Sequence, residues 1–242
     1  MTPPPEKVRY AELLPHEFCA RLEHRAIAYL PLGTLEWHGE HLPLGTDAII
    51  SEDLMCHCAR ELGGIVMPPL YVGPDRSLHD EEGNHLQGMD LAETTCPHRQ
   101  LVGSCYWVPH DLFRYLIDCL LAQLQRAGFK AVFADGHGPS RYSWVSEIDD
   151  RETHFDLKLL GVTEAYGGKW RSQMDHGACN ETSMTLAARP DLVDLSRLPE
   201  ERYIMPQGVS GLDPRDASAP KGKTCRDICI ELVSEMLTNV GL

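Results

Sequence analysis

The sequence contains no long hydrophobic run and no excess of positive charge. Its 242 residues include 22 Lys and Arg against 36 Asp and Glu, which gives a net charge of −14 at pH 7. Nucleic acids and anionic membrane surfaces both attract positively charged proteins, so we expect neither as a partner. No apolar stretch approaches the roughly 20 residues that span a bilayer. The first residues lack the basic start and apolar stretch of a signal peptide, so we expect a cytoplasmic protein.

The nine cysteines form no recognisable framework. Their number is odd and their spacing is irregular, which argues against a set of disulfide bonds. The pairs Cys56/Cys58 and Cys225/Cys229 lie in stretches of helical character, and neither is joined by a second pair at zinc-finger spacing. We expect them to be small buried side chains. The twelve histidines are more informative, because several stand beside glycine and acidic residues, as metal ligands do.

The hydrophobic pattern predicts strands that alternate with helices. Strands are expected at 26–32, 65–67, 130–134 and 157–162, and helices at 10–23, 47–62, 109–127, 181–188 and 221–240. This alternation is typical of an α/β fold with a mostly parallel sheet covered on both faces. The polar segment 71–106 has no clear periodicity, which favours a lid or a binding loop. Without repeats or linkers, we expect a single domain over residues 1–242.

Histidines and carboxylates gather after two predicted strands and at the start of one helix. In open α/β sheets, ligands bind beyond the carboxyl ends of the strands. Taken singly, each residue has an ordinary interpretation, such as a helix cap for Asp47 or a first-turn acid for Glu181. Together they favour a metal site for zinc, manganese or iron(II). The residues are Glu36, His38, His41, Asp47, Asp135, His137, His176 and Glu181.

The same segments resemble motifs of the creatininase family. Residues 32–47, LGTLEWHGEHLPLGTD, are similar to the family signature P-x-G-S-x-E-Q-H-G-P-H-L-P-x-x-T-D. Residues 135–138 resemble its N-G-H-G element, and 176–183 resemble H-[AG]-G-x-x-E-T-S. Two later stretches, 189–195 and 208–217, are similar to R-P-E-L-V-D and G-V-x-G-D-P-x-x-A, so the resemblance runs in order from about Tyr29 to the end.

The resemblance implies a three-layer α/β/α fold that often assembles as a homohexamer, so we expect a homo-oligomer. It also implies a site for two divalent metals; we expect zinc, with manganese or iron as alternatives, at one or two ions per chain. By position, Glu36 and His38 would each bind one ion, Asp47 would bridge both, and His137 would be a further ligand. His176 matches a histidine with a proton-transfer role, and Glu181 an acidic residue close to the metals.

The sequence departs from the family where the substrate would bind. Pro139 stands where creatinine-hydrolysing members carry a metal-binding Glu, so either Glu181 or water fills the gap, or one ion is held. Gly138 replaces a Tyr, Asp135 an Asn and Trp37 a Gln, and the region 74–107 is expanded. These changes argue against creatinine itself. We expect substrate contacts from His41, Asp135 and Gly138, with a supporting role behind a metal ligand as the alternative for His41 and Asp135.

The sequence therefore predicts a metal-dependent amidohydrolase that cleaves a C–N amide bond of a small molecule, a cyclic amide or a formamide, with a metal-activated water. His176 would give a proton to the leaving nitrogen. The family also resembles formamide hydrolases of pyrimidine intermediates and proteins that trim peptides in cofactor maturation. Two other classes stay open. One is a non-catalytic metal- or ligand-binding protein that retains the fold, favoured by Pro139; the other is a cysteine hydrolase on Cys179 or Cys105.

Overall fold

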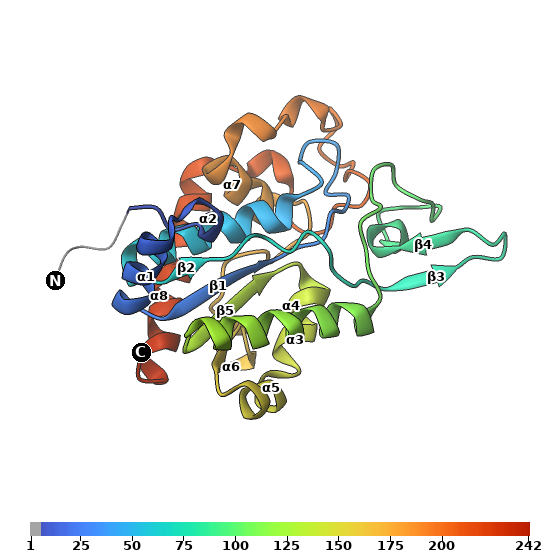
Figure 1. The fold of residues 1–242 in the computed structure, drawn as a ribbon. Helices are drawn as coiled ribbons and strands as arrows, with labels where there is room; N and C mark the ends of the chain where they lie inside the picture. The colour runs from blue at the N-terminus through green and yellow to red at the C-terminus, as the bar shows by residue number, and fades with distance from the viewer. Residues whose placement is uncertain (1–5) are drawn as a thin grey trace.

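Four parallel strands form the central sheet of the computed structural model, which describes residues 6–242. Their order is β2 (Ile65–Val66), β1 (Ile27–Leu32), β5 (Ala131–Gly136) and β6 (Lys158–Leu160). β1 pairs in register with β5 over its whole length and with β2 over two residues. Helices flank the sheet, so the expected α/β fold with a parallel sheet is confirmed (Figure 1).

β1 divides its side chains between two apolar layers, because successive side chains of a strand point to opposite faces. On one face Tyr29 packs with residues of α2 (Thr46–Leu62) and α8 (Ala219–Asn239). On the other face Leu30 packs with residues of α3 (His110–Ala127). All six residues of β1 are buried, as its near-continuous apolar sequence predicts. The two layers hold the strand ends in fixed positions from which the site is built.

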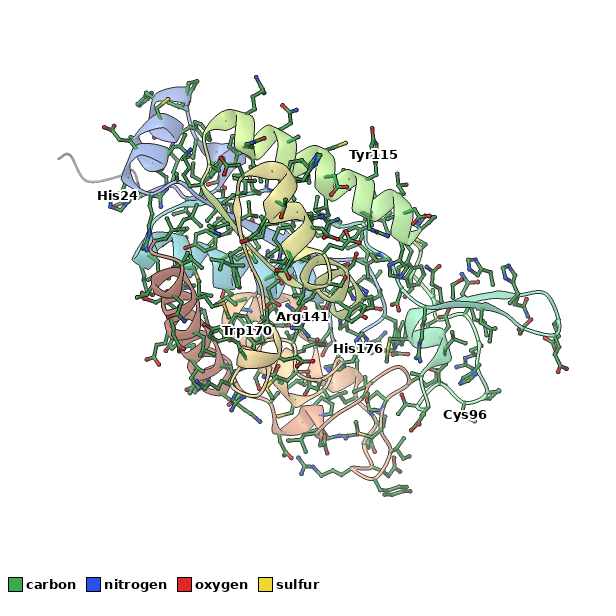
Figure 2. All side chains as sticks on the ribbon, turned by 90° about the horizontal axis from the view of Figure 1, so that it is seen from below. His24, Cys96, Tyr115, Arg141, Trp170 and His176 are labelled. Atoms are coloured by element: carbon green, nitrogen blue, oxygen red, sulfur yellow. The ribbon has the colours of Figure 1, made fainter. Side chains whose placement is uncertain are left out.

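The remaining helices complete the two layers. Figure 2 shows Tyr115 pointing outward from α3, whereas Trp170 is buried. The expected helix 10–23 is divided into a 3-10 turn and α1, and Pro15 begins α1, where a proline costs no hydrogen bond. No helix within residues 6–242 is long and apolar enough to cross a membrane. The other helices are α1 (Pro15–His24), α4 (Gly138–Val145), α5 (Ile148–Phe155), α6 (Glu164–Gly167) and α7 (Cys179–Ala188).

The long polar segment contains a β-hairpin that the sequence pattern did not reveal. β3 (Ser77–His79) pairs antiparallel with β4 (His85–Gln87), and a 3-10 turn, η2 (Gly88–Leu91), follows. The hairpin projects from the same end of the molecule as the loop after β1 (Figure 1). β3 is exposed along its length, so no apolar face constrains it and no apolar period marks it in the sequence.

The helices that follow β1 and β5 cover opposite faces of the sheet. α2 follows β1 onto one face of the sheet, whereas α4 follows β5 onto the other, where Trp144 packs in the same layer as α3. The loops that leave these two neighbouring strands therefore separate and open a crevice at the carboxyl end of the sheet. Ligands of open α/β sheets bind in such a crevice.

The contact between α7 and α8 gives a test of this packing. Gly222 of α8 lies against α7 so closely that a Cβ at this position would come within 2.0 Å of the Ser183 carbonyl oxygen. Because a backbone oxygen cannot move aside alone, we expect Gly222→Ala to lower the free energy of unfolding by about 3 kcal/mol. Urea unfolding measures this loss.

The matched control is Gly167→Ala, where nothing lies within 4 Å of the added Cβ. This variant should unfold at the wild-type urea concentration. Equal midpoints for Gly222→Ala and Gly167→Ala would contradict the close approach of the two helices.

Candidate metal centre

The loop that follows β1 brings a carboxylate and an imidazole into the crevice. The Glu36 amide donates to the Leu44 carbonyl at 2.9 Å, which closes the loop near its base. His38 Nδ1 lies 3.1 Å from the Glu36 carbonyl oxygen. Because a carbonyl only accepts, this contact assigns the proton to Nδ1 and leaves the Nε2 lone pair of His38 free to bind a metal. The side chain of His38 is completely buried.

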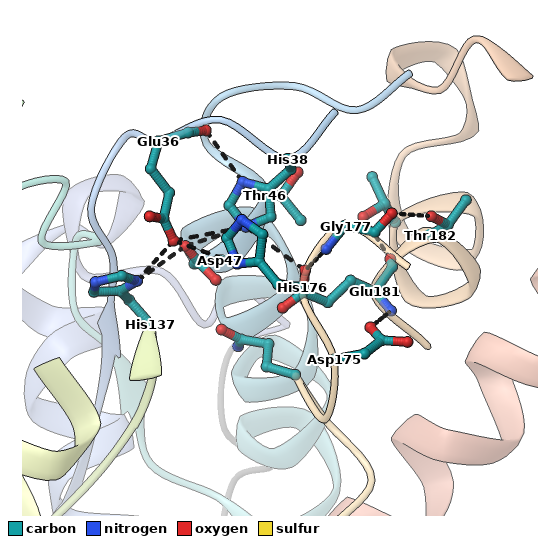
Figure 3. A network of polar contacts seen from close by, with 12 residues as sticks. Glu36, His38, Thr46, Asp47, His137, Asp175, His176, Gly177, Glu181 and Thr182 are labelled. Carbon is teal, nitrogen blue, oxygen red and sulfur yellow. Dashed lines mark hydrogen bonds and ion pairs between the residues drawn. The ribbon is translucent and has the colours of Figure 1, made fainter. Parts of the chain in front are cut away.

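Three carboxylates surround the imidazoles of His38 and His137 (Figure 3). His38 Nε2 lies 3.5 Å from Asp47 Oδ2, 3.6 Å from Glu181 Oε2 and 4.0 Å from Glu36 Oε1. His137 Nδ1 lies 3.0 Å from Glu36 Oε1 and 3.4 Å from Asp47 Oδ2. The same oxygen of Asp47 thus faces both imidazoles. Three groups of donor atoms could each hold a cation: Glu36/Asp47/His137, His38/Asp47/Glu181 and Glu36/His38/His176.

This arrangement fits a bound cation. His38 Nε2 and Asp47 Oδ2 are buried, and neither makes a hydrogen bond with any group in residues 6–242. Leaving such atoms unpaired away from water is costly. Two ligands of one tetrahedral zinc ion, each about 2.1 Å from the metal, are about 3.4 Å apart. The separations between the donor atoms of Asp47 and the two histidines match that spacing.

The protein charges alone make this a site for positive charge. Burial disfavours protonated His38, but the charges of Asp47, Glu181 and Glu36 outweigh it and raise its pKa to about 10. Burial likewise opposes protonation of His137, and Glu36 and Asp47 again raise its pKa. For Glu181, burial outweighs the attraction of His38 and raises the pKa of the carboxyl well above its usual range. The carboxylates are too close together to remain negative without protons or a cation among them.

His176 lies at the edge of this cluster and faces the crevice. Its ring stacks on that of His38 with centroids 4.2 Å apart. Nε2 is 2.7 Å from the Trp37 carbonyl oxygen, and Nδ1 is 3.7 Å from Glu36 Oε1. Burial, together with the neighbouring His38, lowers the pKa of His176. In the neutral ring the Trp37 carbonyl therefore holds the proton on Nε2, and Nδ1 is free to accept one.

Glycine is required at Gly177, which follows His176. Its φ is +59°, and a Cβ here would lie 2.5 Å from the His38 carbonyl oxygen. The Gly177 amide also donates to Glu181 Oε2 at 2.6 Å. The close approach of these backbones brings His176 and Glu181 against the loop after β1, as Figure 3 shows.

The structure does not bring two of the predicted substrate contacts to the crevice. His41 is buried behind the cluster, with Nε2 3.0 Å from Thr182 Oγ1, and burial lowers its pKa to about 4. Asp135 lies within β5 and continues the side-chain alternation of Phe133, so it faces the α8 layer and pairs with Arg141 at 3.2 Å. The side chain of His137 does not lie on the same face as that of Asp135, because β5 ends between them, at Gly136.

A cavity of about 320 Å³ opens beside the cluster. Gly138, for which the sequence predicts a substrate contact, lines this cavity, and so does Pro139. Asp75 and Gln173 also line the cavity, although no pattern in the sequence indicates either residue. Asp75 lies in the segment without periodicity, and its Oδ2 is 3.6 Å from His137 Nε2. Gln173 has a φ of +51°, an unusual conformation for a residue other than glycine and one found at functional sites.

The structure does not bring the two candidate cysteines into the cavity. Cys179 begins α7, is buried, and has its Sγ 3.0 Å from Lys221 Nζ. Cys105 is exposed outside the cavity. Within residues 6–242, neither thiol makes a hydrogen bond with a histidine, the partner that a cysteine hydrolase needs.

Comparisons with known proteins agree with the geometry. The family model described as "Creatininase: Creatinine amidohydrolase" matches residues 11–237. A creatinine amidohydrolase of Pseudomonas putida is 25% identical over 248 residues, which cover 87% of this chain and 88% of that protein. A solved structure named "Creatininase Mn" superposes with a TM-score of 0.71 at 22% identity, covering 96% and 98% of the two chains. A creatininase variant described as Zn-Zn type gives 0.70 at 21% identity, with the same coverage.

The geometry predicts that a divalent cation stabilises the protein through Asp47, which belongs to two of the three ligand groups. A ligand at about 100 times its Kd adds about 2.7 kcal/mol to stability, which raises the Tm of a protein of this size by roughly 5–10 °C. We expect zinc or manganese to produce this shift in chelator-treated wild-type protein but not in Asp47→Asn. Thermal unfolding with and without added metal measures it.

Asp111→Asn is the matched control, because Asp111 is exposed in the first turn of α3. It should keep the full metal-induced shift. A shift of wild-type size in Asp47→Asn would show that the cation binds elsewhere.

Proposed function

The chain belongs to the creatininase family, and we propose that it is a metal-dependent hydrolase that cleaves C–N amide bonds of small molecules. The observation that carries the proposal is the position of Asp47 Oδ2 at the edge of a cavity. This oxygen lies between His38 and His137 and makes no hydrogen bond with any group in residues 6–242. Relatives of this fold are described with manganese and with two zinc ions. We propose zinc here, with manganese or iron as alternatives.

Two groups of side chains would hold the ions. Glu36, Asp47 and His137 would hold one, and His38, Asp47 and Glu181 the other. Glu181 thereby supplies the carboxylate that Pro139 cannot. When bound, divalent ions supply Lewis acidity, which polarises an amide carbonyl and makes water a nucleophile near neutral pH.

His176 carries the proton between water and the leaving group. Its Nε2 is held by the Trp37 carbonyl, so Nδ1 points toward the crevice as the acceptor. Nδ1 takes the proton that water loses as its oxygen bonds to the amide carbon. When the C–N bond breaks, Nδ1 gives that proton to the leaving nitrogen, so the products are a carboxylic acid and an amine. The lowered pKa of His176 keeps the ring neutral and ready to accept at pH 7.

The walls of the cavity favour a substrate other than creatinine. Gly138 and Pro139 leave bare backbone and a proline ring where creatinine-hydrolysing relatives carry larger functional side chains. A volume of about 320 Å³ admits a cyclic amide or a small formamide. Homo-oligomeric assembly and a cytoplasmic location stay predictions from the sequence.

A non-catalytic metal-binding protein is the second candidate, because Pro139 removes a ligand position. His176→Ala separates the two. We expect turnover of the best substrate from a panel of cyclic amides and formamides to fall about 10²–10⁴-fold, the usual contribution of a general acid–base group. Metal content should stay unchanged, because we propose that the ions lie in the two groups that contain Asp47 and not in the group Glu36/His38/His176.

His16→Ala is the control for that substitution, because His16 is exposed on α1. Alkylation of the cysteines should also leave turnover intact. Full activity of His176→Ala would refute the role given to His176. A metal-loaded wild-type protein with no turnover on any amide would favour the non-catalytic candidate.

The ligand assignment predicts two metal ions per wild-type chain and about one in Glu181→Gln. The substitution preserves the hydrogen bond to Gly177 but replaces a charged ligand with a weaker neutral one. Elemental mass spectrometry on protein purified without chelators gives the count. Glu164→Gln, exposed on α6, should keep both ions. Two ions in Glu181→Gln would show that another group fills the position lost at Pro139.

A further inference from the structure

One arginine lines the cavity, and its guanidinium has no acidic partner. Arg76 stands at the base of the hairpin, and its side chain is exposed at the open side of the cavity. No other Lys or Arg side chain of residues 6–242 lines this wall. Among the same residues Arg76 forms no ion pair, because Asp75 Oδ1 accepts from the backbone amide of Arg76, at 2.7 Å, and not from its guanidinium.

The backbone of the hairpin base holds the Arg76 side chain through one nitrogen. Nε donates to the Gly88 carbonyl at 3.3 Å, and the Gly88 amide donates to the Arg76 carbonyl at 3.0 Å. Neither Nη atom makes a hydrogen bond with residues 6–242. A guanidinium in this state offers a fork of N–H donors, which matches the two oxygens of a carboxylate.

The carboxylates of the cavity do not exclude an anion once the metal groups are filled. Glu36, Asp47 and Glu181 belong to groups that could hold cations. Asp175 caps α7, because its two oxygens accept from the amides of Asn180 and Glu181 at 2.7 and 3.1 Å. Two divalent ions together with the arginine would balance the five carboxylates that line the cavity. An anionic group could then approach the guanidinium without net repulsion.

A second polar group in the wall of the cavity lacks a partner. Gln173 lines the cavity and is only 7% exposed, yet its Oε1 makes no hydrogen bond with residues 6–242. Ser51 fixes the orientation of the amide. Its hydroxyl donates to the Asp47 carbonyl at 2.8 Å and therefore accepts from Gln173 Nε2, also at 2.8 Å. The oxygen is thus the atom left to accept from an N–H group of a ligand, and leaving it unpaired is costly.

We propose that the cavity binds a secondary amide that carries a carboxylate, such as an N-acylated amino acid. Arg76 binds the carboxylate, and Gln173 accepts the amide N–H. The proposal rests on the proposed hydrolase function and deepens it by naming the substrate class. It makes Arg76 and Gln173 specificity-determining residues that recognise two separate groups of the substrate.

Small formamides test the two contacts separately. N-formylglycine carries both groups, N-formylglycinamide replaces the carboxylate with a neutral amide, and N-formylsarcosine lacks the N–H. N-formyl-β-alanine and its amide repeat the charge comparison with one more methylene. Equilibrium dialysis against protein with its purified metal complement gives Kd, and kcat/KM takes its place wherever formate is released. We expect wild-type protein to prefer a carboxylate about tenfold over the neutral amide, and N-formylglycine about fivefold over N-formylsarcosine.

Each variant should lose one preference and keep the other. Arg76→Gln should no longer distinguish the carboxylate from the neutral amide. Gln173→Met should no longer distinguish N-formylglycine from N-formylsarcosine, because Met has a similar size but no acceptor. Metal content, measured for each variant, should equal that of wild type. Arg60→Gln is the matched control, because Arg60 is exposed in the last turn of α2 outside the cavity, and it should keep both preferences.

The outcomes separate the binding site from the reaction. No carboxylate preference in wild-type protein, or the same preference in Arg76→Gln, would overturn the role of Arg76. An unchanged N–H preference in Gln173→Met would overturn the role of Gln173 and show that the added methyl group is excluded by size. Both preferences as expected, with no formate released from any ligand, would support the binding site and contradict hydrolysis of these amides.

Discussion

The buried negative charge around Asp47 is the constraint on which the rest of the site depends. Glu36, Asp47 and Glu181 are each about 2% exposed, and all three lie within 4.0 Å of His38 Nε2. Carboxylates at this density cannot all stay ionised in a protein interior unless positive charge lies among them. The fold must therefore hold the cluster firmly enough that a cation or protons bind there and the carboxylates do not move apart.

Rigidity comes from three chain segments that are distant in sequence. Glu36 and His38 follow β1, His137 follows β5, and Glu181 stands in the first turn of α7. β1 and β5 pair over six residues, which fixes the first two segments relative to each other. α7 packs on α2 and α8, and the absence of a side chain at Gly177 lets the third segment meet the first. Each segment alone would leave its charges exposed to water.

The sequence predicted the parts of the site that regular structure positions. Residues 26–32 and 130–134 are short apolar runs, and buried parallel strands require such runs, so the strand ends and the ligands beyond them could be located. The sequence did not reveal that Asp135 faces away from the crevice, because this depends on where β5 ends, at Gly136. Asp75 and Gly88 left no pattern, because the exposed hairpin between them has no buried face to impose one.

The departures from the family pattern concern which segments of the chain place carboxylates in the wall of the cavity. The resemblance implies a carboxylate where this chain has Pro139, at the start of α4, whereas Asp75 lines the same cavity from the base of the hairpin and Glu181 belongs to a group that could hold a cation. The cluster that would hold metal contains three carboxylates, whereas the resemblance implies that the wall beside it differs from that of creatinine-hydrolysing members at Gly138 and Pro139. Since buried hydrogen-bonding groups discriminate between substrates far more strongly than apolar contacts do, such a change alters specificity without altering the fold. The common fold and the altered wall are therefore consistent with each other.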